Sequence, residues 1–540
     1  MGLGMATRRQ PLIARWLMPG GLAALLLVSV AGTTLGALWG QSPSGAFRAV
    51  WQDSYLWHVV RFSFLQAFLS ALLSLLPAIP LARALYQRRF PGRQKLLRLC
   101  AMTLVLPPLV AVFGILSVYG REGWLAQLAG ILGIPWHFSP YGLPGILLAH
   151  VFFNLPLATR LLLQALEQIP GEQRQLAAQL GMRGIHHFRL VEWPWLRRQI
   201  LPIGALIFML CFASFATVLM LGGGPKATTL ELAIYQALSF DYDTGRAALL
   251  GLLQLIFCLG LLLLSQRLSK AIPAGESQGQ AWRSREDSCG QRLADTLIIL
   301  LALLLLLPPL LAVIINGLHH GVSAVMQQTA LWQAIFTSLR IAGGAGVLSV
   351  ILTMMLLWSS RGLRLRHYLL AGQLLETSGM LILAMPGIVL ATGAFLLLNA
   401  TIGLPQSAAP LVMFTNALMA IPYAMKVLDH PMRDLATRYD RLCQSLNISG
   451  INRLRLIELR ALRRPLAQAM AFACVMSIGD FGIVALFGND DFRTLPFYLY
   501  QQMGAYRGSD AAVTALILLA ICFLLFTLIE KLPERHADAD

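Results

Sequence analysis

Asp480 is the residue whose type and setting most suggest chemistry, because it places a carboxylate inside the apolar segment SIGDFGIV. Ionisable side chains within membrane-spanning segments commonly mark the route of a transported substrate or ion. Ser214 stands at the matching place in the segment FASFATV, 266 positions earlier, so the two places differ in charge. Phenylalanines adjoin both places, and aromatic faces attract cations. The candidate pathway residues are Asp480, Ser214, Phe212, Phe215, Phe481, Glu376 and Asn154.

Enzyme chemistry has little support elsewhere in the chain. The glycine cluster LGGGPKATT at 221–229 lacks the glycine that precedes the lysine of a P-loop. The sequence has no H-E-x-x-H motif and no C-x-x-C spacing, and its adjacent histidine pairs, at 186–187 and 319–320, would diverge on a helix. No acid, base and nucleophile converge in the sequence. We therefore expect no catalytic residues, no metal site and no cofactor in this chain.

A charged segment occurs twice in the chain. FRLVEWPWLRR at 188–198 resembles LRLIELRALRR at 454–464, at an offset of 266. The similarity extends to FNLP and MAIP upstream, and to ATTLELAIYQ and FRTLPFYLYQ downstream. Internal similarity at a fixed offset is typical of a duplicated unit. We therefore divide the chain into a first repeat at 1–267, a polar linker at 268–291 and a second repeat at 292–540.

Each repeat places the charged segment in a loop, at about 167–200 and 428–465. In the first loop, Pro170 can start a helix and Gly181 can end it in the left-handed conformation. Asn447 stands at the matching position of the second loop, and asparagine tolerates that conformation next best after glycine. An arginine and a glutamate follow at i,i+3 spacing in both loops, as on one face of a helix. The duplication predicts a docking element rather than a pair of unrelated solvated loops.

Composition identifies the elements that position these residues. The chain of 540 residues is 57% hydrophobic and 12% charged, with a mean hydropathy of +0.67. A soluble core cannot bury so much apolar surface, and apolar runs long enough to cross roughly 30 Å of hydrocarbon recur along the chain. The sequence therefore predicts an all-α membrane protein with about twelve transmembrane helices in two parallel six-helix repeats. The predicted spans are 17–38, 59–84, 99–119, 142–166, 201–222, 246–266, 293–317, 333–359, 369–398, 408–427, 466–488 and 511–531.

The net charge of +17 is distributed as expected for a membrane protein. Arginines and lysines gather before the first span, after the second and eighth, and in the two duplicated loops, all on one side of an alternating topology. The positive-inside rule makes this side the cytoplasm, so both termini and both loops are predicted to be cytoplasmic. No soluble basic domain is present to bind nucleic acid. None of the seven cysteines falls in a predicted outward loop, so no disulfide framework is implied.

The duplicated loop resembles the EAA loop of type I ABC importer permeases. In the first copy, a short helix with two alanines and Leu-Gly is followed, about a dozen residues later, by Trp193 and Pro194. The resemblance implies that each loop forms a coupling helix in a groove of a separate ATP-binding subunit. Two copies of a cytoplasmic ATPase would then bind this chain and would carry the ATP and Mg²⁺. The second copy departs from the pattern at Leu459–Arg460, at Arg441, where the family has an acidic residue, and at Asn447, where it has glycine. The implied coupling residues are Gln175, Ala177, Ala178, Leu180, Gly181, Arg441, Leu446 and Asn447.

Over nearly its full length the chain resembles the thiamine and thiamine pyrophosphate permeases of Gram-negative bacteria. The segments that carry this resemblance are HVVRFSF, HVFFNLP, GEQRQLAAQLGMR, VEWPWLRRQ, IGDFG and FGNDDFRTLPFYLYQQ. It implies import of thiamine, and of its phosphate esters, from a periplasmic thiamine-binding protein across the bacterial inner membrane. Thiamine carries a permanent thiazolium cation, and the carboxylate of Asp480 would offset that charge. A mixed-charge surface on the outward side suits a transient contact with that protein. The candidates for this contact are Asp490, Asp491, Arg493 and Lys226.

Other transporter classes share parts of this pattern. A twelve-helix secondary transporter also has two parallel six-helix halves, and it would follow an ion gradient without an ATPase. Only the position and internal order of the duplicated loops speak against that class. Among ABC importers, permeases for ferric iron or polyamine are the nearest alternatives, since such families share the EAA loop.

Overall fold

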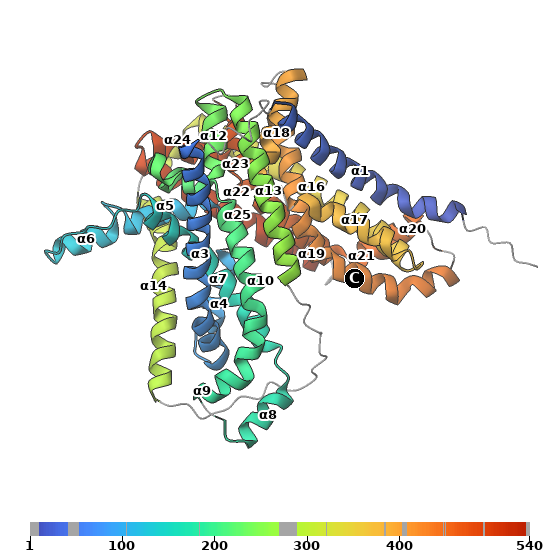
Figure 1. Cartoon of the computed structure of the whole chain (residues 1–540), viewed down its shortest axis with the longest axis horizontal. Coiled ribbons are helices and arrows are strands. Elements are labelled where there is room, and N and C mark those ends of the chain that lie inside the picture. The colour runs from blue at the N-terminus through green and yellow to red at the C-terminus, as the bar shows by residue number, and fades with distance from the viewer. Residues whose placement is uncertain are drawn as a thin grey trace, which may run out of the picture.

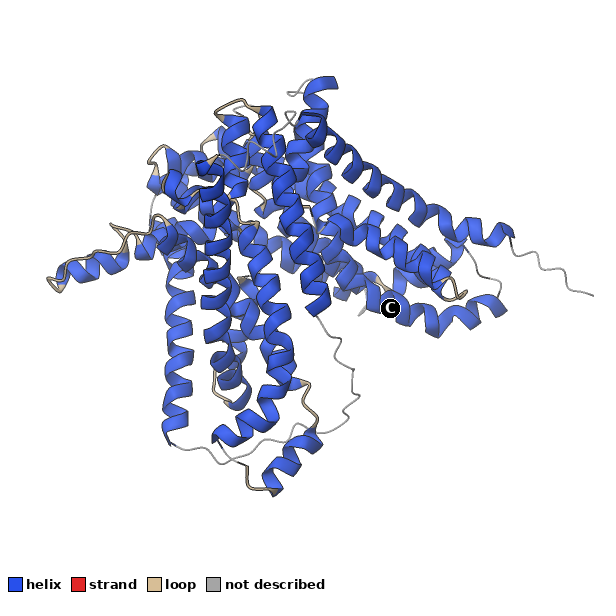
Figure 2. Cartoon of the chain, viewed as in Figure 1, coloured by secondary structure: helices blue, strands red, loops and turns tan. Residues whose placement is uncertain are grey.

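The computed structural model describes residues 10–41, 53–103, 105–182, 184–268, 289–319, 321–382, 385–401, 408–446, 448, 450–489 and 492–535. Every regular element in these residues is a helix (Figure 2). Helices suit a bilayer because they satisfy their backbone hydrogen bonds internally. Ten of the described helices are long and apolar enough to cross a membrane, two fewer than the twelve predicted spans. The prediction of an all-helical membrane protein is therefore confirmed.

The first half of the chain begins with two long helices. Asp53 caps the second of them, because its side chain accepts a hydrogen bond from the Tyr55 N–H at 2.8 Å. The elements in order are α1 (Gln10–Gln41), α3 (Ser54–Gln87), α4 (Arg93–Met102), α5 (Pro108–Tyr119), α6 (Trp124–Ile131), α7 (Leu143–Glu167), α8 (Gly171–Gln179), α9 (Gly184–His187), the π-helix η1 (Phe188–Glu192), α10 (Trp193–Phe212), α11 (Ala216–Leu221), the 3₁₀ turn η2 (Pro225–Ala227), α12 (Leu230–Ser239) and α13 (Thr244–Leu268).

The second half has a similar order of elements. They are α14 (Cys289–His319), α15 (Val322–Met326), α16 (Thr329–Arg364), α17 (Leu369–Leu381), α18 (Gly387–Thr401), α19 (Ala408–Ser445), α20 (Gly450–Arg453), the π-helix η4 (Leu454–Glu458), α21 (Leu459–Ala461), α22 (Arg463–Gly479), α23 (Gly482–Phe487), α24 (Leu495–Gly504) and α25 (Gly508–Arg535). The two π-helices start at Phe188 and Leu454, and so reproduce the offset of the duplicated segment. Such π turns are rare and occur often at functional sites.

Four predicted spans are interrupted, so the prediction of a continuous helix was wrong in each of them. The run 99–119 divides into α4 and α5, and the run 201–222 divides into α10 and α11. The run 369–398 divides into α17 and α18 at Pro386, since proline donates no backbone hydrogen bond and disfavours helix in the residue before it. The run 466–488 divides into α22 and α23 at Asp480, whose backbone is extended at φ −68° and ψ 128°. The interruptions at Pro386 and Asp480 lie in the two predicted spans that have no counterpart among the ten candidate membrane spans.

The helices form two arms that meet at one end (Figure 1). One arm contains α3, α7, α10 and α14 and ends at α8 and α9. The other contains α1, α16, α17 and α19 and ends at α20 and α21. Helices α12, α18, α23 and α24 lie where the arms meet. The two duplicated loops therefore lie at separate ends of the molecule, while the interrupted helix α22–α23 reaches the junction.

The first helix of each half packs against the other half. Helix α1 contacts α16, α17 and α18, while α14 contacts α3 and α5. Glycine makes both crossings close: a Cβ at Gly393 in α18 would overlap Thr34 in α1, and a Cβ at Gly114 in α5 would overlap the Pro309 carbonyl in α14. Small residues let helix backbones approach closely in membranes, where packing holds helices together. Each half therefore depends on the other for part of its packing.

Candidate translocation seam and coupling loops

Four aromatic residues gather where the arms meet, and we call them the aromatic seam: Phe215, Tyr235, Phe481 and Tyr500. Phe215 precedes α11, after the break that follows α10, and Phe481 precedes α23 at the matching position of the second half. Their rings stack at a centroid distance of 5.8 Å with an interplanar angle of 22°. Tyr235 packs edge-on against Phe215 at 5.2 Å, and Tyr500 lies 5.0 Å from Phe481. Sequence-matched rings from the two halves thus face each other.

The flank beside Phe215 consists of hydrogen-bonded neutral groups and a histidine. Ser214 Oγ lies 2.9 Å from His150 Nε2, and the other ring nitrogen of His150 lies 2.8 Å from Ser70 Oγ. Because both nitrogens contact hydroxyl groups, the imidazole is fixed between α3 and the break after α10. This flank offers hydrogen bonds without a carboxylate.

The flank beside Phe481 carries a carboxylate. Asp480 faces the side-chain amide of Asn416 and the first N–H groups of α23, but no cationic side chain among the described residues. Its Oδ2 atom is buried and accepts no hydrogen bond from a described residue. Asn416 is itself fixed, because its Nδ2 donates to Ser477 Oγ at 3.0 Å. Burial of a carboxylate oxygen without a cation is costly, and a positive charge next to Asp480 would lower that cost.

Two candidates from the sequence lie away from the seam. Phe212 packs against Phe64 at 5.1 Å and Phe208 at 6.0 Å, within the contact of α3 with α10. Asn154 donates through Nδ2 to the His150 carbonyl at 2.9 Å and to Cys211 Sγ at 3.2 Å. Both side chains therefore join helices of the first half, and the structure does not bring them to the seam.

Glu376 also lies away from the seam. Its carboxylate accepts hydrogen bonds from Arg364 at 2.6 Å and Arg433 at 3.2 Å, and from the Ser360 hydroxyl at 2.5 Å. These partners lie at the arginine-rich end of α16 and on α19. Two arginines already compensate the charge of Glu376, so its surroundings favour a structural role over a place in the pathway.

Three residues of the seam region escaped the sequence analysis: Tyr235, Tyr500 and His150. A signal was available for the tyrosines, since the matched segments ATTLELAIYQ and FRTLPFYLYQ align them at an offset of 265. His150 and Asn416 are related by the offset of 266. The offset that revealed the loops therefore also relates the polar residues on the two flanks.

The first coupling loop agrees with the sequence prediction. Helix α8 begins after Pro170, and Gly181 follows its end with φ +65°. The Met182 N–H donates to the Ala177 carbonyl at 2.9 Å, which is the long-range bond of a Schellman motif. Ala177 is buried while Gln175 is exposed, so one face of the short helix packs inward and the other faces out.

The second coupling loop keeps the same turn on a longer helix. Helix α19 continues without a break to Ser445, whereas the first half divides the matching stretch into α7 and α8. The Ile448 N–H donates to the Cys443 carbonyl at 2.8 Å, in the position matching the bond of the first loop. Arg441 is exposed, and Asn447 lies outside the described residues.

Each loop exposes leucines at matching positions, and we call them the leucine faces. Leu176 and Leu180 are 57% and 63% exposed in the first loop. Leu442 and Leu446 are 49% and 60% exposed in the second. Contiguous exposed apolar side chains beside charged residues commonly mark a protein contact. The leucine faces therefore suit the docking of a protein partner.

A buried glutamate ties each loop to a long helix. Glu192, at the end of η1, accepts a hydrogen bond from Arg83 Nε at 2.7 Å. Glu458, at the end of η4, pairs with Arg361 and accepts from Arg453 Nε at 3.0 Å. Arg83 belongs to α3 and Arg361 to α16, so a displacement of either loop would be transmitted to its long helix.

Arg453 adds a second attachment in the second loop. Its Nη1 donates to Asp440 Oδ1 at 2.6 Å, which links α20 to α19. Burial by itself lowers the pKa of the Arg453 guanidinium, but the hydrogen bond to Asp440 and the charge of Glu458 raise this pKa above its ordinary value. The guanidinium therefore stays charged within the loop.

Two of the predicted contacts with a binding protein are described. Lys226 is exposed before α12, and its backbone carbonyl lies 3.0 Å from His58 Nε2 of α3. Arg493 is partly exposed before α24. Asp490 and Asp491 lie outside the described residues.

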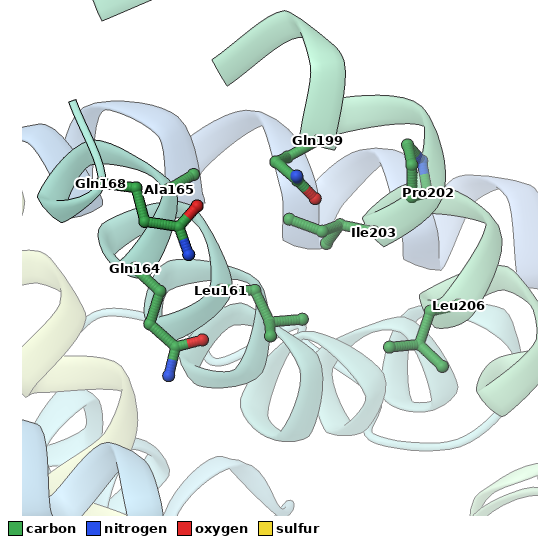
Figure 3. A pocket seen from close by; sticks show the side chains of 8 residues that line it. All are labelled: Leu161, Gln164, Ala165, Gln168, Gln199, Pro202, Ile203 and Leu206. Carbon is green, nitrogen blue, oxygen red and sulfur yellow. The ribbon is translucent and has the colours of Figure 1, made fainter. Parts of the chain in front are cut away.

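A cavity of about 250 Å³ opens between α7 and α10, on the side of the coupling loop (Figure 3). Gln164 and Gln168 line it from α7, and Gln199 lines it from α10. Its remaining lining residues are Leu161, Ala165, Pro202, Ile203 and Leu206. None of the eight is charged or aromatic, so the aromatic seam is better suited to hold an organic cation.

Comparison with known proteins identifies the family. Residues 72–273 match the family described as binding-protein-dependent transport system inner membrane component. The thiamine transport system permease protein ThiP of Escherichia coli (strain K12) is 73% identical over 99% of this chain and 100% of that protein. ThiP of Haemophilus influenzae is 43% identical over 96% of each chain. The sulfate transport system permease protein CysW of Synechococcus elongatus is 29% identical over 34% of this chain and 64% of that protein. The chain therefore belongs to the family of thiamine transport system permease proteins, which are binding-protein-dependent components of the inner membrane.

Proposed function

We propose that this chain is the membrane permease of an ATP-driven importer that moves thiamine, and also its phosphate esters, into the cytoplasm. The observation that carries the proposal is 73% identity to a thiamine transport permease, over 99% of this chain and 100% of that protein. The chain is a permease component and not itself an ATPase. A partner subunit would bind ATP and Mg²⁺.

The proposal includes two parallel halves of six membrane segments each, with both termini in the cytoplasm. The order of elements supports this division, because a π-helix, an interrupted helix and a short helix follow one another in both halves at nearly constant offset. Counting the interrupted pairs α17–α18 and α22–α23 as spanning segments would raise the ten continuous spans to twelve.

Two copies of a cytoplasmic ATPase would dock on the two coupling loops. The leucine faces support this assignment, since both loops expose leucines at the same positions. The coupling residues would be those predicted from the sequence, around Ala177 and Gly181 in one loop and Arg441 and Leu446 in the other. Closure of the ATPases would pull the loops together, and the pairs of Glu192 with Arg83 and Glu458 with Arg361 would carry that movement into α3 and α16.

A periplasmic thiamine-binding protein would dock on the opposite face. Lys226 and Arg493, with Asp490 and Asp491, would supply a mixed-charge surface for a transient contact. Rocking of the halves would then open the aromatic seam to the released substrate, and the seam would close again behind it.

The experiment that tests this function is uptake of labelled thiamine by cells that lack their own thiamine import. One set of cells receives this chain, its ATPase and its binding protein, further sets receive each pair of the three, and a last set receives this chain alone. Uptake that requires all three supports the proposal. Uptake with this chain alone would indicate a secondary transporter, and no uptake in any combination would redirect the search to ferric iron and polyamine.

A further inference from the structure

We infer that the aromatic seam and its two unlike flanks form a recognition site inside the permease, which admits an aromatic organic cation in one orientation. The cationic ring would face Asp480, and a neutral hydrogen-bonding heterocycle would face Ser214 and His150. The inference rests on the proposed function, because thiamine consists of a thiazolium cation joined to a neutral aminopyrimidine. It adds a selectivity step within the membrane to the choice made by a binding protein.

The stacked phenylalanines define a closed state of this site. A planar ring held between Phe215 and Phe481 needs about 7 Å between their faces, since carbon atoms in contact lie roughly 3.5 Å apart. The observed centroid distance is 5.8 Å. That distance is too short for a third ring between the two, so Phe215 and Phe481 must move apart before a ligand ring can enter. Their near-parallel planes are already oriented for such a sandwich.

The unlike flanks assign an orientation. Asp480 and Ser214 occupy matching positions directly before the two stacked rings, so each half of the chain contributes one flank. Their partners also match in position, since Asn416 faces Asp480 and His150 contacts Ser214. One flank therefore compensates a positive charge, and the other supplies only hydrogen bonds. A symmetric pair of flanks would accept either orientation equally.

The state of Asp480 supports a cationic ligand rather than a purely structural role. Its Oδ2 atom is buried and has no hydrogen-bond partner among the described residues. Asn416 and the start of α23 face the carboxylate, and a neutral amide at position 480 would keep its size. The substitution Asp480→Asn therefore removes the charge while disturbing the packing least.

The test uses the complete transporter in proteoliposomes, with thiamine-loaded binding protein outside and ATP inside. For Asp480→Asn we expect thiamine transported per ATP hydrolysed to fall roughly tenfold or more, because a desolvated charge partner is lost. We expect ATP hydrolysis to remain within about twofold of wild type, since the coupling loops are unchanged. Asp480→Glu, which keeps the charge, is expected to recover part of the transport. The matched control is Glu122→Gln, an exposed carboxylate outside the seam, which is expected to behave as wild type.

The outcomes separate this inference from the proposed function. Wild-type complex that moves no thiamine would remove the proposed function and the inference with it. Wild-type transport together with an unaffected Asp480→Asn variant would overturn the inference alone, as would an equal loss in Asp480→Asn and Asp480→Glu with ATP hydrolysis lost in both.

If Asp480→Asn does not assemble, binding to the wild-type complex of permease and ATPase decides the matter. Equilibrium dialysis would compare thiamine, pyrithiamine, whose pyridinium keeps the positive charge, and thiochrome, which is neutral. We expect both cations to bind at least roughly tenfold more tightly than thiochrome. Equal binding of all three would overturn the inference.

Discussion

Two glutamates in matching positions show how a single buried carboxylate fixes a loop. Glu458 is fully buried and faces Arg361 and Arg453, whereas Glu192 is buried against an Arg83 whose side chain is 21% exposed. Removing one partner of a buried pair leaves an uncompensated charge, and the cost rises with the burial of the remaining partner. The two sites therefore differ in the stability that each glutamate provides.

We predict that Glu458→Gln destabilises the folded protein by about 3 to 5 kcal/mol, and Glu192→Gln by less. The reason is that an amide at position 458 would leave the buried Arg361 guanidinium without its carboxylate and Arg453 with Asp440 alone, while Arg83 can reach water. The measurement is thermal unfolding of the purified protein in a mild detergent. Arg455→Gln, which alters an exposed residue of the same π-helix, serves as the control. A smaller effect of Glu458→Gln than of Glu192→Gln would contradict the burial argument.

Single residues were predictable where the duplication relates them and unpredictable where a distant partner decides their role. The offset of 266 singled out Phe215 and Phe481, which do stack on each other. Glu376 was predicted as a candidate pathway residue, because it lies within a predominantly apolar run of the sequence. Its surroundings depend on Arg433, which is 57 residues away in the chain. A single sequence does not show which distant arginine pairs with a given carboxylate in the folded protein.

At the scale of the elements, the turn at Gly181 after the short helix α8 determines how the leucine face of the first loop is oriented. Gly181 adopts φ +65°, and a Cβ there would meet no atom within 4 Å. A substitution at this position therefore strains the backbone without a steric clash. The strain acts on the turn that orients Leu180 and so on the leucine face.

We predict that Gly181→Val weakens binding of the ATPase by roughly 5- to 30-fold, because a β-branched residue resists the left-handed conformation by about 1 to 2 kcal/mol. The affinity is measured by titrating purified ATPase onto the permease in detergent. Gly181→Asn is the matched control, since asparagine tolerates the conformation, and it should remain close to wild type. Unchanged affinity in the valine variant would argue against α8 as the docking element.

The sequence predicted the elements well wherever a local signal exists. Pro170 and Gly181 predicted the limits of α8, and the structure confirms both. The breaks within four predicted spans were missed, those at Pro386 and Asp480 among them, because hydropathy averages over a window and the apolar residues continue on both sides of each break. A helix interrupted within the membrane keeps the composition of a continuous one, so only backbone geometry reveals it.

At the scale of the whole molecule, the first helix of each half packs against the other half and so joins the two. We call this arrangement the exchange of first helices. Thr34 of α1 and Gly393 of α18 meet closely enough that a Cβ at 393 would lie 3.1 Å from the Thr34 Cα. A disulfide needs its two Cβ atoms about 3.5 to 4.5 Å apart, so a bridge between positions 34 and 393 is within reach once the two helices move apart slightly. The exchange is therefore open to a direct chemical test.

We predict that the double substitution Thr34→Cys and Gly393→Cys, in a background without the seven native cysteines, cross-links the halves. A protease site inserted within the linker at 269–288 allows the chain to be cut after purification. On a non-reducing gel the two fragments should stay together, and a reductant should separate them. Fragments that separate without reductant would contradict the packing of α1 on the second half. The single variant Thr34→Cys is the control.

The exchange of first helices also sets the order of events during biogenesis. Helix α1 ends at Gln41, whereas its partner helix α16 starts only at Thr329, in the second half of the chain. Synthesis proceeds at roughly 5 to 20 residues per second, so about 15 to 60 s pass between the end of α1 and the start of α16. During that time α1 lies in the lipid without this partner. The first half is thus synthesised before the packing of α1 can be completed. The surface of α1 that contacts the second half is accessible to insertion factors and quality-control proteases until the second half is inserted.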